Sequence, residues 1–222
     1  MFKFWGDGSQ EAMEKVGEIV VRSTENFNWT FIFILSVVFY IYWSEIKKKE
    51  WDTLCAGLAL YAVHWLYEIA NAVIAKLTGY PLWAVSNDST TFILLIGVCW
   101  ELSMMFSIAG MISFKMLPDD RSKRYFARGS FRGIDCRLVG ALEMALLFAL
   151  FESFLAATKN FSFIWVYKWW GVLPVFITTY VPFFLASNYV PDMQPEKRKK
   201  LLIGLWSSVA ILLAVLIPLG II

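Results

Sequence analysis

The chain has 222 residues, of which 59% are hydrophobic and 18% are aromatic. Soluble domains average about 45–50% apolar residues, so this composition is typical of an integral membrane protein and excludes an ordinary soluble domain. The formal net charge of +2 is too small to indicate a nucleic-acid partner.

The chain begins with a short amphipathic segment, residues 1–27. Between residues 9 and 22 apolar side chains recur at helical spacing, and glutamate and lysine side chains occupy the opposite face. This pattern predicts a short interfacial helix that lies on the membrane surface.

A six-helix transmembrane domain is predicted over residues 28–222. Each predicted span is near the roughly 20 residues that a bilayer requires. The spans cover residues 28–43, 53–76, 90–116, 137–158, 171–190 and 199–222. Pro174 and Pro182 predict a kink in the fifth span. We therefore expect an all-α, polytopic membrane bundle with the amphipathic segment at its N-terminus.

Lysine and arginine residues are concentrated in three loops. The loops after the first, third and fifth spans hold 14 of the 20 Lys and Arg residues, and all three lie on one side of the predicted bundle. Because basic loops stay on the cytoplasmic side, both termini are predicted to be non-cytoplasmic. The basic runs at residues 47–49 and 197–200 fit such flanks, with binding of anionic lipid or nucleic acid as the alternative.

His64, Glu68 and Asn71 lie on one face of the second predicted span. Their spacing places them on the same side of a helix, and His64 is the single histidine of the chain. A charged side chain inside a membrane costs about 3 kcal/mol on insertion scales, so an ionisable residue there is a functional-site candidate. Asn71 is predicted either to bind a polar group of a ligand or to pair with another helix.

Three glutamates are predicted to share one depth in the membrane. Glu68, Glu101 and Glu152 each lie about 22 Å from the cytoplasmic end of their span, at about 1.5 Å per residue. Three neighbouring helices would then present carboxyl groups in one layer beside His64. Protonated carboxyls that join helices by hydrogen bonds are the structural alternative. Glu143 lies on the opposite face of the fourth span, where we expect it to contact water or a basic loop residue.

Such a layer favours acid/base chemistry on an apolar lipid. In a low dielectric a carboxyl favours its neutral form and can donate a proton, while a neighbouring carboxylate or imidazole can accept one. Aromatic rings would stabilise a cation, and the kinked fifth span would expose hydroxyl groups to a cavity. The predicted catalytic residues are His64, Glu68, Glu101 and Glu152. The predicted substrate-binding residues are Asn71, Trp65, Trp100, Thr178, Thr179 and Tyr180.

No cofactor or metal is predicted. A single histidine excludes haem sites with two histidines, zinc sites with three and histidine-box iron sites, and the sequence has no P-loop, GxSxG or HExxH pattern. Cys55, Cys99 and Cys136 have neither metal-ligand nor disulfide spacing, so three free thiols are expected.

Four features together resemble the emopamil-binding, sterol-isomerase-like (EXPERA) family of small helical membrane proteins. They are His64-Trp-Leu-Tyr-Glu68, VCWELS with Glu101, LFESF with Glu152, and the aromatic, proline-containing WVYKWWGVLP. The resemblance implies proton-driven double-bond migration in a sterol or similar lipid, with Glu68 or Glu101 moving the proton and His64 assisting. The family's asparagine on the fifth span has no evident counterpart, and a sixth span is added. Trp100-Glu101 is also similar to small membrane terpene cyclases, which implies cyclisation of an isoprenoid.

Two other classes of function stay open. Intramembrane carboxylates also suit a proton- or cation-coupled transporter or channel, and long aromatic faces suit a non-catalytic subunit of a larger membrane complex. We expect membrane lipids as partners, an apolar small molecule as a candidate substrate, and no nucleic acid. A homo-oligomer or a larger complex is compatible with each class.

Overall fold

The amphipathic segment at the N-terminus forms a short helix that packs on protein. The computed structural model describes residues 2–25, 27, 29–87, 92–130, 132–158 and 163–222. Helix α1 (Gln10–Gly17) begins where the Ser9 hydroxyl accepts a hydrogen bond from the Ala12 amide at 3.2 Å. Ala12 and Val16 are buried in a cluster with Ala84, Ile164 and Val166. Part of the apolar face of this helix therefore packs on protein, and its predicted place at the membrane surface stays a prediction.

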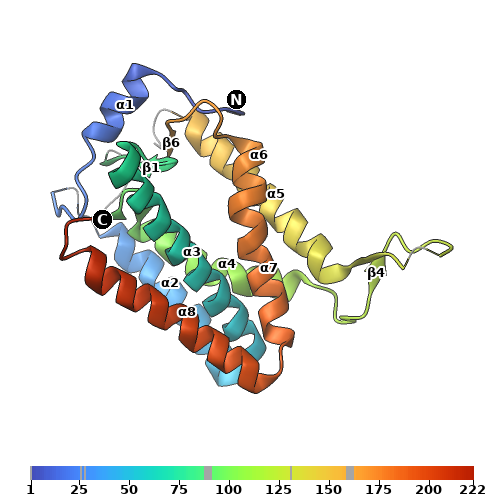
Figure 1. Cartoon of the computed structure of the whole chain (residues 1–222). Helices are drawn as coiled ribbons and strands as arrows, with labels where there is room; N and C mark the ends of the chain where they lie inside the picture. Colours follow the sequence, from blue (N-terminus) through green and yellow to red (C-terminus); the bar gives the residue numbers. More distant parts are fainter. Residues whose placement is uncertain (1, 26, 28, 88–91, 131, 159–162) are drawn as a thin grey trace.

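Long helices make up most of the remaining chain (Figure 1). They are α2 (Thr30–Lys48), α3 (Trp51–Thr78), α4 (Trp100–Met116), α5 (Cys136–Ala157) and α8 (Pro195–Leu216), together with a continuous segment of α6 (Val172–Pro174), the π-helix η2 (Val175–Tyr180), α7 (Val181–Tyr189) and the 3-10 turn η3 (Val190–Asp192). Among the described residues, five of these units are long and apolar enough to cross a membrane; α4, with 17 residues, is not one of them. The prediction of an all-α membrane bundle is confirmed.

The predicted helical structure is wrong for the first described residues of the third span. The span was predicted to begin at Thr90, which lies outside the described residues, as does Asn28 at the start of the first span. Residues from Ile93 onward form β2 (Ile93–Leu95) and β3 (Val98–Cys99), and the helix starts only at Trp100. The apolar run thus contains a hairpin with β-branched residues on both strands and Gly97 between them, which hydropathy alone does not distinguish from a helix.

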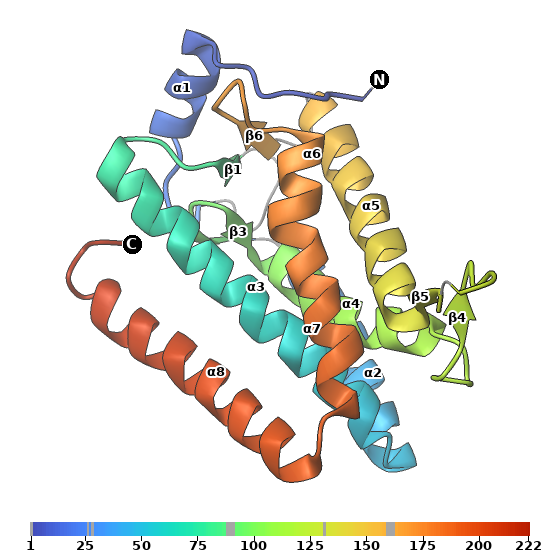
Figure 2. The same ribbon diagram turned by 45° about the vertical axis from the view of Figure 1, so that its right-hand side comes forward.

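A second two-stranded ribbon joins loops that are distant in sequence. β1 (Trp83–Val85) follows α3, β6 (Phe163–Trp165) follows α5, and the two pair antiparallel. Trp83 lies directly opposite Trp165, and both side chains are buried. The ribbon lies beside α1 at the end of the bundle where both chain termini are found (Figures 1 and 2). The third ribbon, β4 (Arg124–Tyr125) with β5 (Ile134–Asp135), projects from the opposite end.

Helix α3 is the central element of the bundle. It packs against α4, α7 and α8, whereas more than half of the residues of α2 and of α8 are exposed. The main core lies between α3, α4, α5, the α6–α7 segment and the tryptophans of the β1–β6 ribbon. Gly110 permits the close approach of α4 to α3, because a Cβ there would lie 2.5 Å from the Ala56 carbonyl oxygen. The exposed apolar faces of α2 and α8 suit contact with lipid.

We predict that Gly110→Ala lowers the stability of the folded bundle by about 1–3 kcal/mol, because the added methyl group overpacks the α3–α4 contact. Gly204→Ala on α8 is the matched control, since no atom lies within 4 Å of a Cβ at that position. Thermal unfolding in detergent, followed by helical circular dichroism, measures both changes. Equal melting temperatures for Gly110→Ala and the unmodified protein would contradict the prediction.

Candidate functional site beneath a tryptophan pair

A small cavity lies inside the bundle where the β1–β6 ribbon meets α3, α5 and the π-helix. Its volume of about 20 Å³ is enough for one water molecule, since a water needs roughly 10–15 Å³ by this measure. The polar side chains that line it are His64, Glu68, Glu152, Thr179 and Tyr180. The remaining lining includes Trp83, Gly97, Leu102, Phe106, Phe163, Val175 and Phe183.

Glu68 is held by an indole from the ribbon. The Trp83 Nε1–H donates to both carboxylate oxygens, at 3.1 and 3.2 Å. The Nε2 atom of His64, one helical turn away on α3, lies 3.5 Å from Glu68 Oε1. Both the His64 and the Glu68 side chains are buried.

Glu152 on α5 is held in the same manner by the other strand. The Trp165 Nε1–H donates to Oε1 at 2.7 Å, and the Tyr180 hydroxyl donates to Oε2 at 2.5 Å. Glu152 is also buried. Each carboxyl group therefore receives at least one hydrogen bond inside the bundle, which offsets part of the cost of removing it from water.

The register of the ribbon explains why the two carboxyl groups have matching donors. Residues directly opposite each other on antiparallel strands project from the same face. Because Trp83 lies opposite Trp165, one face of the ribbon directs one indole to Glu68 on α3 and the other to Glu152 on α5. The ribbon thus links two helices through a pair of buried carboxyl groups.

Asn71 holds strand β1 in position, and Gly97 leaves space for the contact between Glu68 and Trp83. The Asn71 side-chain amide donates to the Trp83 carbonyl oxygen at 2.8 Å and accepts from the Leu82 amide at 2.8 Å. A Cβ at position 97 would lie 2.5 Å from Glu68 Oε2 and from Trp83 Nε1, so the site requires glycine there. Asn71, predicted to bind substrate or to pair with a helix, thus contacts the backbone around β1.

The His64 ring contacts aromatic rings, and its Nε2 approaches Glu68 Oε1 without a hydrogen bond. Its ring stacks on Phe106 with the centroids 4.2 Å apart, and Tyr61 lies on another side at 6.1 Å. Within the described residues, neither ring nitrogen has a hydrogen-bond partner. A buried imidazole of this kind is suited to accept or donate a proton on the cavity side, because Nε2 already faces Glu68.

The π-helix brings two hydroxyl groups to the site. Pro174 and Pro182 flank η2, and the wider turn places Thr179 and Tyr180 in the cavity wall. π-Helices are rare and are frequent at functional sites. Thr178 is exposed and donates to the Pro174 carbonyl oxygen at 2.7 Å, so it lies away from the cavity.

Of the three glutamates predicted to share one layer, Glu68 and Glu152 line the cavity and Glu101 does not. Because α4 begins at Trp100, Glu101 lies in the first turn of that helix instead of near its middle, and it does not line the cavity. Trp100 contacts the rings of Phe31 and Phe92, and Trp65 lies against Tyr61 and His64 outside the cavity lining.

Two features of this site were not predicted from the sequence. Trp83 was not identified at all, and Trp165 carries a hydrogen-bonding role that no local pattern indicates. The cavity is also far smaller than the roughly 300–1,000 Å³ of typical small-molecule sites. Among the described residues, no group of three or more His, Cys, Asp or Glu side chains could hold a metal ion.

We predict that Trp83→Phe destabilises the folded protein by about 1–3 kcal/mol, because Glu68 loses its indole donor while the ring is largely kept. Trp165→Phe should cost less, since Glu152 keeps the Tyr180 donor. Trp170→Phe is the matched control, because Trp170 is buried against Trp83 and its Nε1 has no partner in the described part of the chain. Chemical unfolding in detergent measures all three; the same loss for Trp83→Phe and Trp170→Phe would contradict the assigned hydrogen bond.

Comparison with known proteins places the chain in a family. Residues 9–218 match a family described as an uncharacterized membrane protein family. A protein from Archaeoglobus fulgidus, described as uncharacterized, is 35% identical over 200 residues, covering 88% of this chain and 91% of that protein. No solved structure matches.

The expected EXPERA membership is wrong, because the matching family is a different one. The H-x-x-x-E spacing places a histidine and a glutamate on one helix face in any bundle, so it does not distinguish families. Over nearly its whole length, the chain belongs to this uncharacterized family of integral membrane proteins.

Proposed function

We propose that the protein translocates protons, as a proton-coupled transporter or channel, and that Glu68, Glu152 and His64 bind the proton in transit. One observation carries this proposal: two carboxyl groups and an imidazole without a hydrogen-bond partner among the described residues line one water-sized cavity. Two like charges in apolar surroundings are unfavourable, so such a pair favours sharing a proton. An imidazole and a water molecule beside it are suited to pass that proton on.

The size of the cavity favours proton transfer over lipid chemistry. A sterol or isoprenoid needs several hundred Å³, whereas about 20 Å³ admits a water molecule. The carboxyl groups are also occupied by indole and hydroxyl donors from within the protein, which leaves little capacity to orient a bulky substrate. The geometry therefore favours the transporter class over the isomerase class.

A polar hollow at the α1 end supports the proposal, because it shares a wall residue with the inner cavity. A second hollow of about 200 Å³ is lined by polar residues of the N-terminal segment, among them Asp7, Glu11 and Lys15, and by the end of α5. Phe163 lines both this hollow and the inner cavity. A single aromatic residue of β6 thus forms part of the wall of each.

Buried hydroxyl groups continue from the site toward the opposite end. The Tyr61 hydroxyl lies 2.6 Å from Ser103 Oγ, and the Tyr42 hydroxyl donates to the Ser107 carbonyl oxygen at 2.8 Å. Further along α4, Ser113 donates to Asn188 at 2.9 Å. These contacts lie at three levels along α4 and join it to α3, α2 and α7 in turn, so intervening water would have to complete a proton path between them.

We predict that the purified protein conducts protons in liposomes. Glu68→Gln and Glu152→Gln should each abolish the flux, because an amide side chain does not bind and release a proton near neutral pH. A pH-sensitive dye inside the vesicles measures uptake driven by a potassium diffusion potential. Glu143→Gln is the control on the same helix as Glu152, since Glu143 is exposed and outside the cavity.

Two results would contradict the proposal. One is a proton flux in vesicles with the unmodified protein that is no greater than the flux in empty vesicles, and the other is full flux in both the Glu68→Gln and the Glu152→Gln variants. Infrared spectroscopy gives an independent check, since a shared proton produces a protonated-carboxyl band that either variant should change. Absence of that band in the unmodified protein at neutral pH would also count against a shared proton.

We further predict that Phe163→Ala accelerates proton exchange between the α1 side and the cavity, whereas Phe163→Leu changes it little. The smaller side chain opens the wall between the two hollows, and leucine largely keeps the apolar barrier. Hydrogen–deuterium exchange of the Trp83 and Trp165 indole N–H groups, observed by NMR, reports this access directly. Unchanged indole exchange in Phe163→Ala would show that Phe163 does not limit access.

A further inference from the structure

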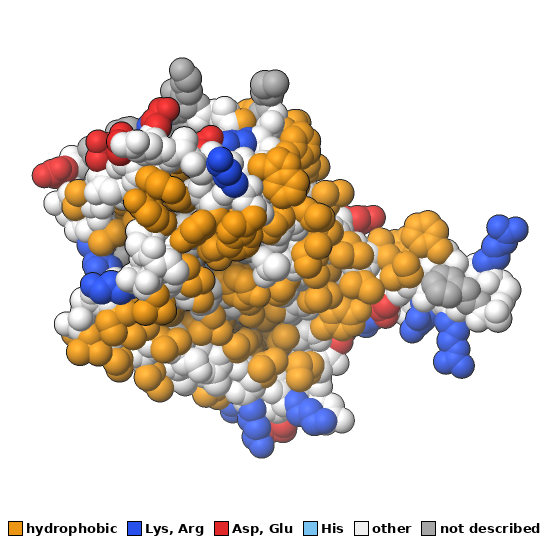
Figure 3. Space-filling view, turned by 45° about the horizontal axis from the view of Figure 1, so that its top comes forward, with side chains coloured by type: hydrophobic (Ala, Val, Ile, Leu, Met, Phe, Trp, Pro, Cys, Tyr) orange, Lys and Arg blue, Asp and Glu red, His pale blue; other side chains and the backbone are white. Residues whose placement is uncertain are grey.

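A basic hairpin, here called the arm, leaves the bundle between α4 and α5. It comprises the described residues 117–130 and 132–135, with β4 and β5 paired near its root. In both ribbon views it extends sideways, away from the other helices, at the end opposite α1 (Figures 1 and 2). In the space-filling view, Lys and Arg side chains surround the projecting part (Figure 3).

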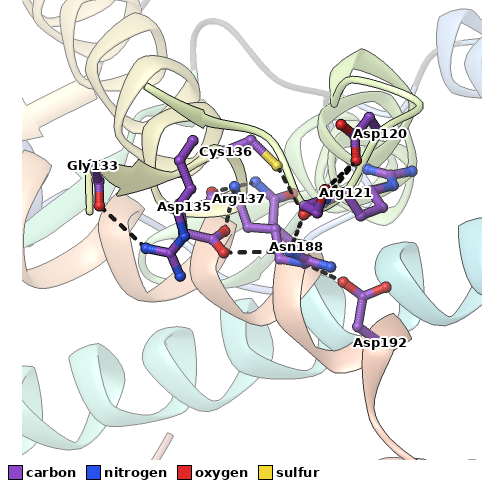
Figure 4. A network of polar contacts seen from close by, with 10 residues as sticks. Asp120, Arg121, Gly133, Asp135, Cys136, Arg137, Asn188 and Asp192 are labelled. Atoms are coloured by element: carbon purple, nitrogen blue, oxygen red, sulfur yellow. Dashed lines mark hydrogen bonds and ion pairs between the residues drawn. The ribbon is translucent and has the colours of Figure 1, made fainter. Parts of the chain in front are cut away.

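The root of the arm is fastened by polar contacts around Arg137 (Figure 4). The Arg137 guanidinium donates to the Arg121 carbonyl oxygen at 2.8 Å and pairs with Asp192 at the end of the α6–α7 segment. Asp135 accepts from the Arg137 amide at 2.8 Å, which caps α5. The Asn188 amide donates to the Arg137 carbonyl oxygen at 3.2 Å. The arm is therefore attached at both of its ends to two helices.

Four exposed cations of the arm form no ion pair with the described residues. Lys123, Arg124, Arg128 and Arg132 are exposed, and in the described part of the chain none of them forms an ion pair. Asp135 is used by Arg137, and Asp120 accepts hydrogen bonds from the Ser122 hydroxyl and amide, which hold its pKa below the usual value. Arg124 donates one hydrogen bond to the Gly133 carbonyl oxygen at 3.2 Å, which leaves its other N–H groups available to an external anion, together with the Arg128 and Arg132 guanidinium groups.

The level of the arm is set by ion pairs at the helix ends. Lys115 pairs with Glu45 at 2.7 Å, and Arg198 pairs with Asp52, at the same end of the bundle as the Arg137 contacts. Such charges mark the level at which the helices leave the hydrocarbon slab. Because the root of the arm belongs to this level and the arm extends sideways in both ribbon views, its cations would lie near the height of the headgroups in a bilayer. Phe126, exposed with 76% of its surface, adds an apolar ring there.

We propose that the arm binds anionic phospholipid headgroups, with Arg124, Arg128 and Arg132 contacting phosphate and Phe126 entering the interface. Arginine forms paired hydrogen bonds with phosphate oxygens, and an aromatic ring beside it suits the boundary between headgroups and acyl chains. A soluble nucleic acid or acidic protein fits less well, because a sideways arm directs its cations along the membrane.

The test uses the full chain in nanodiscs with an environment-sensitive fluorophore attached through Ser130→Cys, an exposed position of the arm. The background carries Cys55→Ser, because Cys99 and Cys136 are buried whereas Cys55 is partly accessible. We expect blue-shifted emission in phosphatidylglycerol nanodiscs relative to phosphatidylcholine nanodiscs, and reversal of the shift at high salt. Inorganic phosphate added to phosphatidylcholine nanodiscs should have no effect.

Arg124→Gln, Arg128→Gln and Arg132→Gln combined should remove the shift, since three basic residues near an anionic surface contribute roughly a 100-fold preference. Lys197→Gln, Lys199→Gln and Lys200→Gln combined remove equal charge from the start of α8 and should leave the shift intact. Helical circular dichroism verifies that both triple variants fold. Identical emission in the two lipids, or a shift produced only by RNA or an acidic peptide, would overturn the proposal.

Discussion

The hydrogen bonds from two tryptophan indoles to two intramembrane glutamates are the interactions on which this structure depends. A carboxyl group in a low-dielectric interior needs polar partners, and loss of such a hydrogen bond costs about 1–3 kcal/mol. Here the partners come from a ribbon whose strands follow different helices, so satisfying the two glutamates also closes one end of the bundle. The same hydrogen bonds therefore stabilise this end of the fold and form the polar site.

The same interactions limit the chemistry that the site supports. Trp83 and Tyr180 occupy space that a ligand would need, and the remaining cavity matches a single water molecule. The cavity is lined by two carboxyl groups and by an imidazole that has no hydrogen-bond partner among the described residues. A site of this size and composition is better suited to binding a proton than to enclosing a lipid.

The two ends of the molecule differ in how they use charge. At the α1 end, the carboxyl groups are buried beneath an apolar ribbon and a helix that packs on it. At the opposite end, ion pairs between helix termini are combined with an arm whose cations have no acidic partner among the described residues. The predicted orientation, with the basic end in the cytoplasm, stays a prediction.

The sequence by itself determined the helical membrane class, most helix positions and the shared face of His64 and Glu68, because hydropathy and helical spacing are local properties. It did not predict that α4 starts only at Trp100, with Glu101 in its first turn and outside the cavity lining, since hydropathy does not distinguish an apolar strand from an apolar helix. Only the tertiary structure decided the partners of Glu68 and Glu152. Trp83 and Trp165 are 82 residues apart, and only the antiparallel register of their strands brings the two indoles to one site.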